Sequence, residues 1–307
     1  MPDLSSKKVF VADLLKRLEF PEDSHETFLS AMDKICEDKT ATAWFESLLE
    51  QYEGNENCDY PQMLAHAKKL AAAVELHEYT VSLLMFLVMA EKLLERYKER
   101  GFSEELWLHS LRDLRYKVHE CRRVHGINGS FVSWWFPGFY KLTRFAFCRL
   151  QFEIISLPND YTVGGRLLKK GSKAINMHIP NTGTKLTHDS VLESYKQAAE
   201  WFKGEFEGEP IVFICTSWLL SPWHKEVLPP TVNLVQFFDD FKLVESGQYE
   251  TYSALWLLFD KDVTKDISSL PRDSTLRRLY ADRVEKGEAT YWGKGVFIYE
   301  DGKIIND

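Results

Sequence analysis

The chain has 307 residues, of which 45% are hydrophobic and 27% are charged, a balance typical of a globular protein long enough for two domains. Its 38 basic and 46 acidic residues give a formal net charge of −8, which argues against a nucleic-acid partner. The longest apolar run, residues 81–90, is too short to cross a bilayer, because a spanning helix needs about 20 residues. We therefore expect neither nucleic acid nor a membrane as partner.

The cysteines are odd in number and none are close neighbours in sequence: Cys36, Cys58, Cys121, Cys148 and Cys215. This pattern predicts reduced thiols rather than a disulfide framework, and hence a cytoplasmic protein. There is no CxxC pair, so we expect no zinc ribbon and no metal. The N-terminal stretch Met1–Val9 has no apolar core and does not read as a signal peptide.

Residues 1–128 show helical spacing of apolar side chains and no strand signal. The expected helices are a first segment around residues 9–18 ended by Pro21, a second capped by Asp23 or Ser24, a third capped by Thr40 and ended by Gly54, and then residues 61–76, 80–100 and 103–126. Caps, acidic first turns and terminal glycines supply the start and stop signals. The sequence thus predicts an all-helical domain over 1–128.

Aromatic residues gather in the next segment, with eight between Phe131 and Phe147. One interpretation is packing between two domains, and the other is that some of these rings wall a ligand pocket.

From Phe147 onwards the pattern changes to strands alternating with helices. The predicted elements are strands at 147–157, 174–180 and 210–216, a helix at 187–206, a short helix at 232–241, a hairpin of 243–245 with 249–259, a helix from Asp273-Ser274 to Lys286, a strand at 290–299, and a turn into Ile304-Ile305. This order suggests two strand-strand-helix-strand units. We expect an α+β protein whose second domain, 129–307, is a mixed sheet covered by helices.

Polar side chains share one face of the first two predicted strands. Side chains alternate between the faces of a strand, so Arg149, Gln151 and Glu153 lie together, as do Asn176 and His178. If the strands pair, these five residues meet on one surface. An ordinary solvated sheet face remains the plainer alternative. A carboxylate and an imidazole placed in this way could remove a proton from an attacking amine or alcohol.

A second candidate site lies at the end of the predicted strand 211–216. Thr216, Ser217 and Trp218 fall at the edge where α/β proteins often bind ligands. Ser217 could cap a short helix, or the N–H groups at that helix start could meet a phosphate or a thioester carbonyl. The basic loop 166–173 could contact phosphates, or be a solvated hairpin tip.

Common catalytic signatures are missing from the chain. There is no GxGxxG, Walker loop, HExxH or GxSxG segment, which disfavours a dehydrogenase, a P-loop kinase, a zincin protease and an α/β-hydrolase.

Three segments, Arg149–Glu153, Ile175–Pro180 and Cys215–Leu220, resemble a family of bacterial acyltransferase domain-containing proteins. The similarity extends to Asn233 with Phe237 and to the helix start at Asp273. Members pair a helical N-acyltransferase N-terminal domain with a GNAT-like C-terminal domain. The usual GNAT segment Arg/Gln-x-x-Gly-x-Gly/Ala, whose amides bind a pyrophosphate, does not occur here.

The resemblance implies transfer of an acyl group from acyl-CoA, or acetyl-CoA, to the nitrogen or oxygen of a small-molecule acceptor. Glu153 or His178 would then be the catalytic base. The acceptor would be bound by residues on the strands and beyond them, namely Arg149, Gln151, Asn176, Trp218 and Asn233. Thr216 and Ser217 would meet the acyl-CoA. The alternative is a non-catalytic small-molecule-binding or sensor protein on a GNAT-like scaffold.

Overall fold

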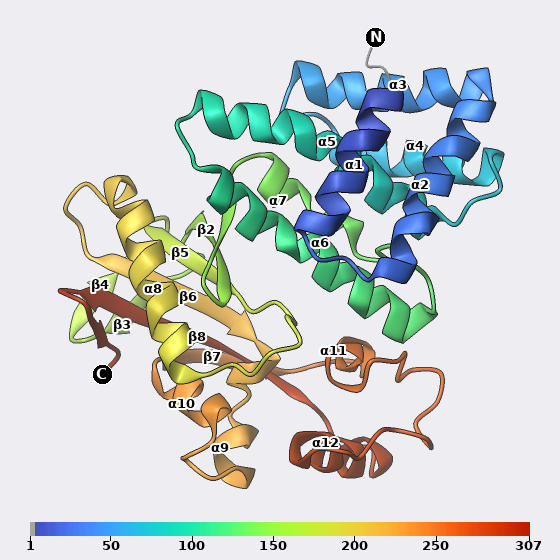
Figure 1. Cartoon of the computed structure of the whole chain (residues 1–307). Helices are drawn as coiled ribbons and strands as arrows, with labels where there is room; N and C mark the ends of the chain where they lie inside the picture. Colours follow the sequence, from blue (N-terminus) through green and yellow to red (C-terminus); the bar gives the residue numbers. More distant parts are fainter. Residues whose placement is uncertain (1–3) are drawn as a thin grey trace. The chain divides into compact units, whose positions relative to one another are not determined.

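The computed structural model describes residues 4–307 (Figure 1). The first three residues of the N-terminal stretch that was predicted not to be a signal peptide lie outside the described part. The chain divides into two compact units, one ending at Phe145 and the other comprising Ala146–Asp307. Within residues 4–307, every helix is too short or too polar to cross a lipid bilayer.

Six helices make up most of the first unit, as the sequence predicts: α1 (Leu4–Arg17), α2 (Glu22–Glu37), α3 (Lys39–Gly54), α4 (Tyr60–Ala73), α5 (Glu78–Glu99) and α6 (Glu104–His125). Helix α5 forms the centre, since residues 80–90 are all buried. Two predicted caps are wrong. Asp38, not Thr40, accepts the first N–H groups of α3, and α2 begins after Pro21 with no side-chain cap.

The aromatic segment 129–145 is counted with the first unit, whereas the sequence places the domain boundary after residue 128. It contains the 3-10 turn η1 (Ser133–Trp135) and the short helix α7 (Pro137–Tyr140). Tyr140 donates a hydrogen bond to the carbonyl of Phe86 at 2.5 Å, and its ring lies 5.7 Å from that of Tyr52. These contacts join the segment to α3 and α5. Buried aromatic rings contribute large contact areas, so they stabilise this packing.

A mixed sheet forms the second unit, with the strand order β1-β2-β5-β6-β8-β7 and β9 beside β8. Its strands are β1 (Arg144–Phe147), β2 (Leu150–Ser156), β5 (Lys173–His178), β6 (Ile211–Ser217), β7 (Lys242–Gln248), β8 (Tyr291–Glu300) and β9 (Lys303–Ile305), and a separate hairpin holds β3 (Tyr161–Val163) and β4 (Arg166–Leu168). Strands β5 and β6 are parallel, and β2–β5, β6–β8 and β7–β8 are antiparallel. The α+β class is thus confirmed.

The helices of this unit are α8 (His188–Phe202), α9 (Trp223–Val227), α10 (Asn233–Asp239), α11 (Trp256–Phe259) and α12 (Thr275–Glu285), with 3-10 turns η2 (Lys203–Glu205), η3 (Trp218–Leu220) and η4 (Ser253–Leu255). Helix α8 lies along the sheet in Figure 1. Tyr195 of α8 contacts Phe213 and Phe297, whose rings stack with centroids 4.9 Å apart. We call this the helix face of the sheet.

The other face, here called the hairpin face, has an apolar half formed by Ala174, Val212, Ile214, Val296 and Ile298. Tyr161, Val163 and Leu168 of the β3–β4 hairpin cover this half. Burial of this apolar area is the main source of stability for the hairpin, because a two-stranded ribbon is marginal alone.

Three predicted strands differ from the structure. The strand predicted over 147–157 is broken by a turn at Cys148, whose φ is 50°, so Arg149 is not on a strand. Segment 243–259 is not a hairpin, because β7 runs through Ser246-Gly247 to Gln248 and residues 253–259 are helical. The predicted second strand-strand-helix-strand unit is therefore wrong at its second strand, because residues 253–259 are helical. Leu255 and Phe259 instead pack with Tyr280 and Val284 of α12.

Candidate functional site

The polar residues predicted on the first two strands meet on the hairpin face. Strands β2 and β5 are antiparallel neighbours, with Glu153 opposite Asn176 and Gln151 opposite His178. Opposed residues in a ladder project to the same side, and these four continue the face that carries Ala174 and Ile214. They lie beyond its apolar half, towards the C-terminal end of β5. The predicted pairing of these two strands is therefore present in the structure.

Glu153, Asn176 and His178 form a hydrogen-bonded group. His178 Nε2 lies 2.7 Å from Glu153 Oε1, and Asn176 Nδ2 lies 3.3 Å from the same oxygen and 3.1 Å from His178 Nε2. The side chains of His178 and Glu153 are 22% and 18% exposed, so the pair is sheltered but accessible from solvent.

The distances determine where the imidazole proton lies. The Asn176 amide nitrogen can only donate, and a carboxylate oxygen can only accept. A proton on His178 Nε2 donated to Glu153 satisfies both contacts to Oε1, and Asn176 Nδ2 and His178 Nε2 are then both donors and make no hydrogen bond with each other. In the neutral imidazole, Nδ1 is then the nitrogen with the lone pair. A carboxylate that fixes a histidine tautomer and stabilises the imidazolium is the arrangement of a general base.

The two other predicted strand residues have different surroundings. Gln151 is almost fully buried, with 2% exposure. Arg149 lies in the β1–β2 turn, where its backbone N–H donates to Ser194 Oγ at 2.9 Å and its guanidinium donates to the carbonyl of Pro180 at 2.8 Å. The latter bond joins the turn to the segment that follows β5.

The residues predicted at the end of β6 are divided between the two faces. Thr216 is exposed on the hairpin face, level with Lys294 of β8. Ser217 projects to the other side and caps η3 by accepting the N–H of Leu219 at 3.1 Å. Trp218 is half-buried in η3, and Asn233 begins α10. Of the predicted residues, Thr216 therefore shares a face with His178, and Ser217 does not.

A buried histidine holds η3 in place. His224 is fully buried, with Nδ1 3.1 Å from the carbonyl of Leu219 and Nε2 2.8 Å from the hydroxyl of Tyr280. Burial lowers the pKa of His224 to about 4, so the ring is neutral at pH 7 and its Nε2 accepts a hydrogen bond from the Tyr280 hydroxyl. Sequence reasoning missed this residue, since a single histidine among tryptophans carries no spacing signal.

The parallel strands β5 and β6 separate at their C-terminal ends. Their ladder pairs Ile175 with Phe213 and Asn176 with Ile214. Beyond these pairs, β5 continues beside β2 to His178, and β6 continues beside β8 to Ser217. The facing edges of residues 177–178 and 215–217 thus lie outside the β5–β6 ladder. An extended ligand could pair with such edges by the same hydrogen bonds that a strand uses.

The segment after β5 leads into the N-terminus of α8 and was not singled out from the sequence. Gly183 has a φ of 76°, and its N–H donates to Asn181 Oδ1 at 3.3 Å. Lys185 is exposed, and Thr187 caps α8. A glycine-containing turn between a central strand and a helix start presents N–H groups and positive potential to an anion. In the sequence, a single glycine is the only sign of this turn, and it does not identify an anion site without knowledge of the strand order.

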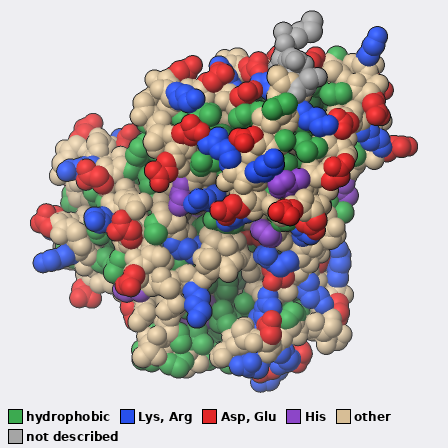
Figure 2. Space-filling model, in the orientation of Figure 1, with side chains coloured by type: hydrophobic (Ala, Val, Ile, Leu, Met, Phe, Trp, Pro, Cys, Tyr) green, Lys and Arg blue, Asp and Glu red, His purple; other side chains and the backbone are tan. Residues whose placement is uncertain are grey.

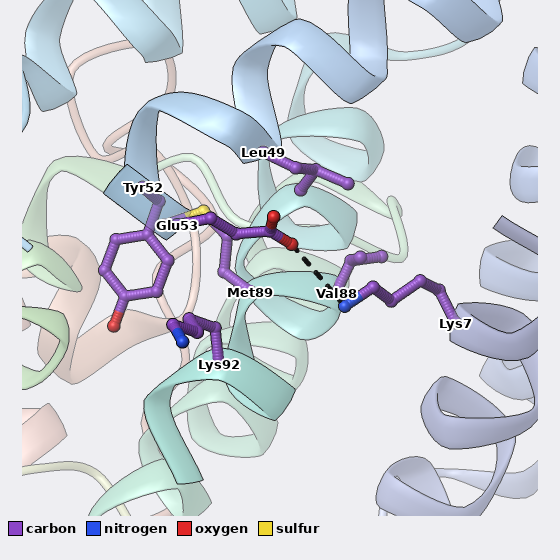
Figure 3. Close-up of a pocket in the computed structure, with 7 residues that line it drawn as sticks. All are labelled: Lys7, Leu49, Tyr52, Glu53, Val88, Met89 and Lys92. Carbon is purple, nitrogen blue, oxygen red and sulfur yellow. Dashed lines mark ion pairs between the residues drawn. The ribbon is translucent and has the colours of Figure 1, made fainter. Parts of the chain in front are cut away.

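The described residues also form a small hollow in the first unit, between α1, α3 and α5 (Figure 3). Lys7 extends over it to Glu53 at 3.7 Å and to Glu91 at 2.6 Å. None of the residues predicted from the sequence lines it. Among residues 4–307, no group of three or more His, Cys, Asp and Glu side chains is placed to hold a metal ion.

Two family models match the chain in succession. Residues 9–142 match the N-acyltransferase N-terminal domain, and residues 145–297 match the GNAT-like C-terminal domain. The junction between the matches agrees with the division of the structure after Phe145. Comparison with curated proteins gives no match.

Solved structures share the whole fold. An acyltransferase in complex with decanoyl-CoA and teicoplanin is 22% identical, with a TM-score of 0.70 over 93% of this chain and 86% of that chain. Another, in complex with decanoyl-CoA, is 21% identical, with a TM-score of 0.70 over 92% of this chain and 86% of that chain. Together with the two family matches, the fold shows that this chain belongs to the proteins in which an N-acyltransferase N-terminal domain precedes a GNAT-like C-terminal domain.

Proposed function

We propose that the protein is an acyl-CoA-dependent acyltransferase in which His178 is the general base and Glu153 orients it. The observation that carries this proposal is the 2.7 Å contact between the two side chains, next to the point where β5 and β6 separate. A base must lie within hydrogen-bond reach of the proton it removes, and a sheltered but accessible pair can satisfy this.

In the proposed step, an acceptor amine or hydroxyl attacks the thioester carbonyl. The proton of the attacking group passes to His178, the new C–N or C–O bond forms, and the C–S bond breaks. The leaving thiolate takes a proton, so that free CoA thiol and acylated acceptor are the products. Glu153 stabilises the imidazolium through the Nε2 hydrogen bond, and Asn176 keeps the carboxylate oriented. Base catalysis of this kind typically contributes about 100- to 10,000-fold.

Two features of the chain support acyl-CoA as the co-substrate. The edges of β5 and β6 beyond their ladder would pair with the amide groups of the pantetheine arm. The segment 181–187, with Lys185 and the N-terminus of α8, would receive the phosphates. The structures with the same fold were solved with decanoyl-CoA or octanoyl-CoA bound. Medium-chain acyl-CoAs are therefore the first donors to test, beside acetyl-CoA.

We propose a small molecule as the acceptor. Two structures with this fold hold teicoplanin or 10C-teicoplanin, and those ligands belong to those proteins. For this chain, the roles of Gln151, Thr216, Ser217, Trp218 and Asn233 in binding stay predictions. Thr216 has the best placement among them, because it is exposed on the face that carries His178.

The test is release of CoA thiol from decanoyl-CoA with a panel of primary amines and alcohols, with the acylated product detected by mass spectrometry. We expect acceptor-dependent turnover that falls at least about 100-fold in His178→Asn, given the usual size of general-base catalysis. His66→Asn, on α4, is the matched control and should keep full activity. Binding of acyl-CoA without turnover of any acceptor in the panel would instead favour the ligand-binding or sensor function. Equal turnover by His178→Asn and the unaltered protein would refute His178 as the base.

A further inference from the structure

A second polar cluster lies on the hairpin face, at the side of β6 away from His178. Glu245 of β7 accepts three hydrogen bonds: from Lys294 of β8 at 2.5 Å, from the hydroxyl of Tyr161 at 2.8 Å and from the side-chain amide of Asn159 at 2.8 Å. Two of these donors belong to the segment that opens the β3–β4 hairpin. The carboxylate is therefore held from two sides, and the position of Lys294 is fixed with it.

Both members of the Lys294–Glu245 pair are charged at neutral pH. The hydrogen bond from Lys294 lowers the pKa of Glu245. Burial acts to lower the pKa of Lys294, but the interactions with Glu245 and Tyr161 together outweigh burial and raise this pKa. Lys294 cannot serve as a base in this state, but it is a fixed cation with only 15% of its side chain exposed.

The ammonium of Lys294 has more hydrogen-bonding capacity than the pair uses. It carries three N–H donors, of which Glu245 takes one at 2.5 Å and the Tyr161 hydroxyl interacts with another. By contrast, the carboxylate of Glu245 already receives three donors. An ion pair that only joins the two strands would need no further donor. An ordered ammonium with one remaining donor beside an exposed hydroxyl is suited to bind an oxygen atom. That hydroxyl belongs to Thr216, directly opposite Lys294 in the β6–β8 ladder.

The position of this cluster relates it to the proposed base. Thr216 and His178 both stand two residues beyond the last β5–β6 pair, Asn176–Ile214, so His178, Thr216 and Lys294 lie in one row across the sheet. Neighbouring paired strands are about 4.8 Å apart, and β5 and β6 separate beyond their last pair, so Lys294 lies more than about 10 Å from His178 along that row. A single small molecule could contact both.

We propose that Lys294 and Thr216 bind a carboxylate of the acceptor while its amine or hydroxyl lies at His178. The inference rests on the proposed function and names the acceptor class, an amino acid or hydroxy acid with several bonds between its two groups. Glu245 already balances the charge of Lys294, so a bound anion adds net negative charge to this cluster. A singly charged carboxylate is therefore favoured over a doubly charged phosphate, because excess negative charge next to a carboxylate is repulsive.

The binding test does not depend on catalysis. In protein labelled with ¹³C,¹⁵N-lysine, the Lys294 side-chain signal is identified by its absence from Lys294→Gln and followed during titration with butyrate, butyramide and inorganic phosphate. We expect a saturable shift with butyrate, little shift with butyramide, and a weaker response in Thr216→Val. The signal of exposed Lys303 on β9 is the internal control. No shift of Lys294 with butyrate, or an equal shift with butyramide, overturns the inference even if the protein proves to be an acyltransferase.

The kinetic test uses a series of ω-amino acids of increasing length: glycine, β-alanine, γ-aminobutyrate and ε-aminocaproate, each against the alkylamine of the same length. We expect the longer amino acids to exceed their alkylamines in kcat/KM by at least about 10-fold, and this preference to vanish in Lys294→Gln but not in Lys303→Gln. Equal use of amino acids and alkylamines by the unaltered protein contradicts the inference. Absence of turnover with every amine contradicts the proposed function, and the lysine titration then decides on the carboxylate site alone.

Discussion

Glu153 Oε1 accepts two hydrogen-bond contacts from β5, one from His178 at 2.7 Å and one from Asn176 at 3.3 Å, although 25 residues separate Glu153 from His178 in the chain. The antiparallel ladder that places Glu153 opposite Asn176 produces this relationship. One strand thus supplies the carboxylate and its neighbour supplies the imidazole. The rigidity of two central strands holds the pair in one geometry, which a loop could not do as well.

Replacing Glu153 with Gln tests the orienting role. The amide cannot stabilise an imidazolium, so we expect kcat for acyl transfer to fall roughly 10- to 1,000-fold with little change in the KM for acyl-CoA. Glu193→Gln on α8 is the matched control, and an unchanged kcat in Glu153→Gln would remove Glu153 from the mechanism.

Replacing Lys185 with Gln tests the segment between β5 and α8 as the phosphate site. We expect the Kd for decanoyl-CoA to rise about 5- to 10-fold, the loss of one exposed charge-assisted contact of about 1 kcal/mol. Binding of S-decanoyl pantetheine, which has no phosphates, should not change. Lys203→Gln, at the other end of α8, serves as control. Calorimetric titration of the unaltered protein and both variants with each ligand measures the six constants, and an equal loss for both ligands in Lys185→Gln would place the phosphates elsewhere.

The stability of the second unit should depend on His224 below neutral pH. Its folded pKa is lowered from 6.5 to about 4 by burial. The unfolded chain therefore takes up a proton between these values that the folded chain does not, and the free energy of unfolding decreases as pH falls through that window, by at most about 3 kcal/mol.

In His224→Gln, which keeps a donor for Leu219 and an acceptor for Tyr280, this part of the pH dependence should disappear. Urea unfolding at pH 7, 5.5 and 4 measures it. A variant with the same pH dependence as the unaltered protein would show that His224 is not the group responsible.

Gly293 should tolerate no side chain. A Cβ atom there would lie 1.9 Å from the carbonyl oxygen of Leu220, so η3 would have to move away from β8. We expect Gly293→Ala to lower the free energy of unfolding by about 2–4 kcal/mol, as in other overpacked sites. Gly204→Ala is the matched control, because no atom lies within 4 Å of its added Cβ. Similar melting temperatures for both variants would contradict the close approach of η3.

The sequence predicts the helices of the first unit and the polar face of β2 and β5 because both depend on local periodicity. Glu153 and His178 were identified by alternation alone, since a period of two is directly visible in the residue order. The strand order was not visible in this way. Lys294, Glu245 and Tyr161 come from three separate segments and meet only because β8 lies between β6 and β7.

The errors have local causes. At Cys148 the left-handed φ of 50° breaks an alternating pattern that reads as one strand, and a non-glycine residue gives little warning of such a turn. At 249–259 the aromatic and aliphatic side chains resemble a strand, but Leu255 and Phe259 are buried against α12. Tertiary packing therefore overrides β-propensity there. Thr216 and Ser217 were treated as one group, although adjacent residues of a strand project to opposite faces.

Mixed charges cover the visible surface in Figure 2, so the face shown there does not by itself indicate where an acyl-CoA would bind. The most direct measurement is the melting temperature with and without decanoyl-CoA, acetyl-CoA and free CoA. A ligand that binds only the folded protein at a hundredfold excess over its Kd adds about 2.7 kcal/mol to the free energy of unfolding. We predict a clear increase with decanoyl-CoA, reduced in Lys185→Gln. No increase with any CoA species would contradict acyl-CoA as the co-substrate and leave the GNAT-like fold as the scaffold of a different activity.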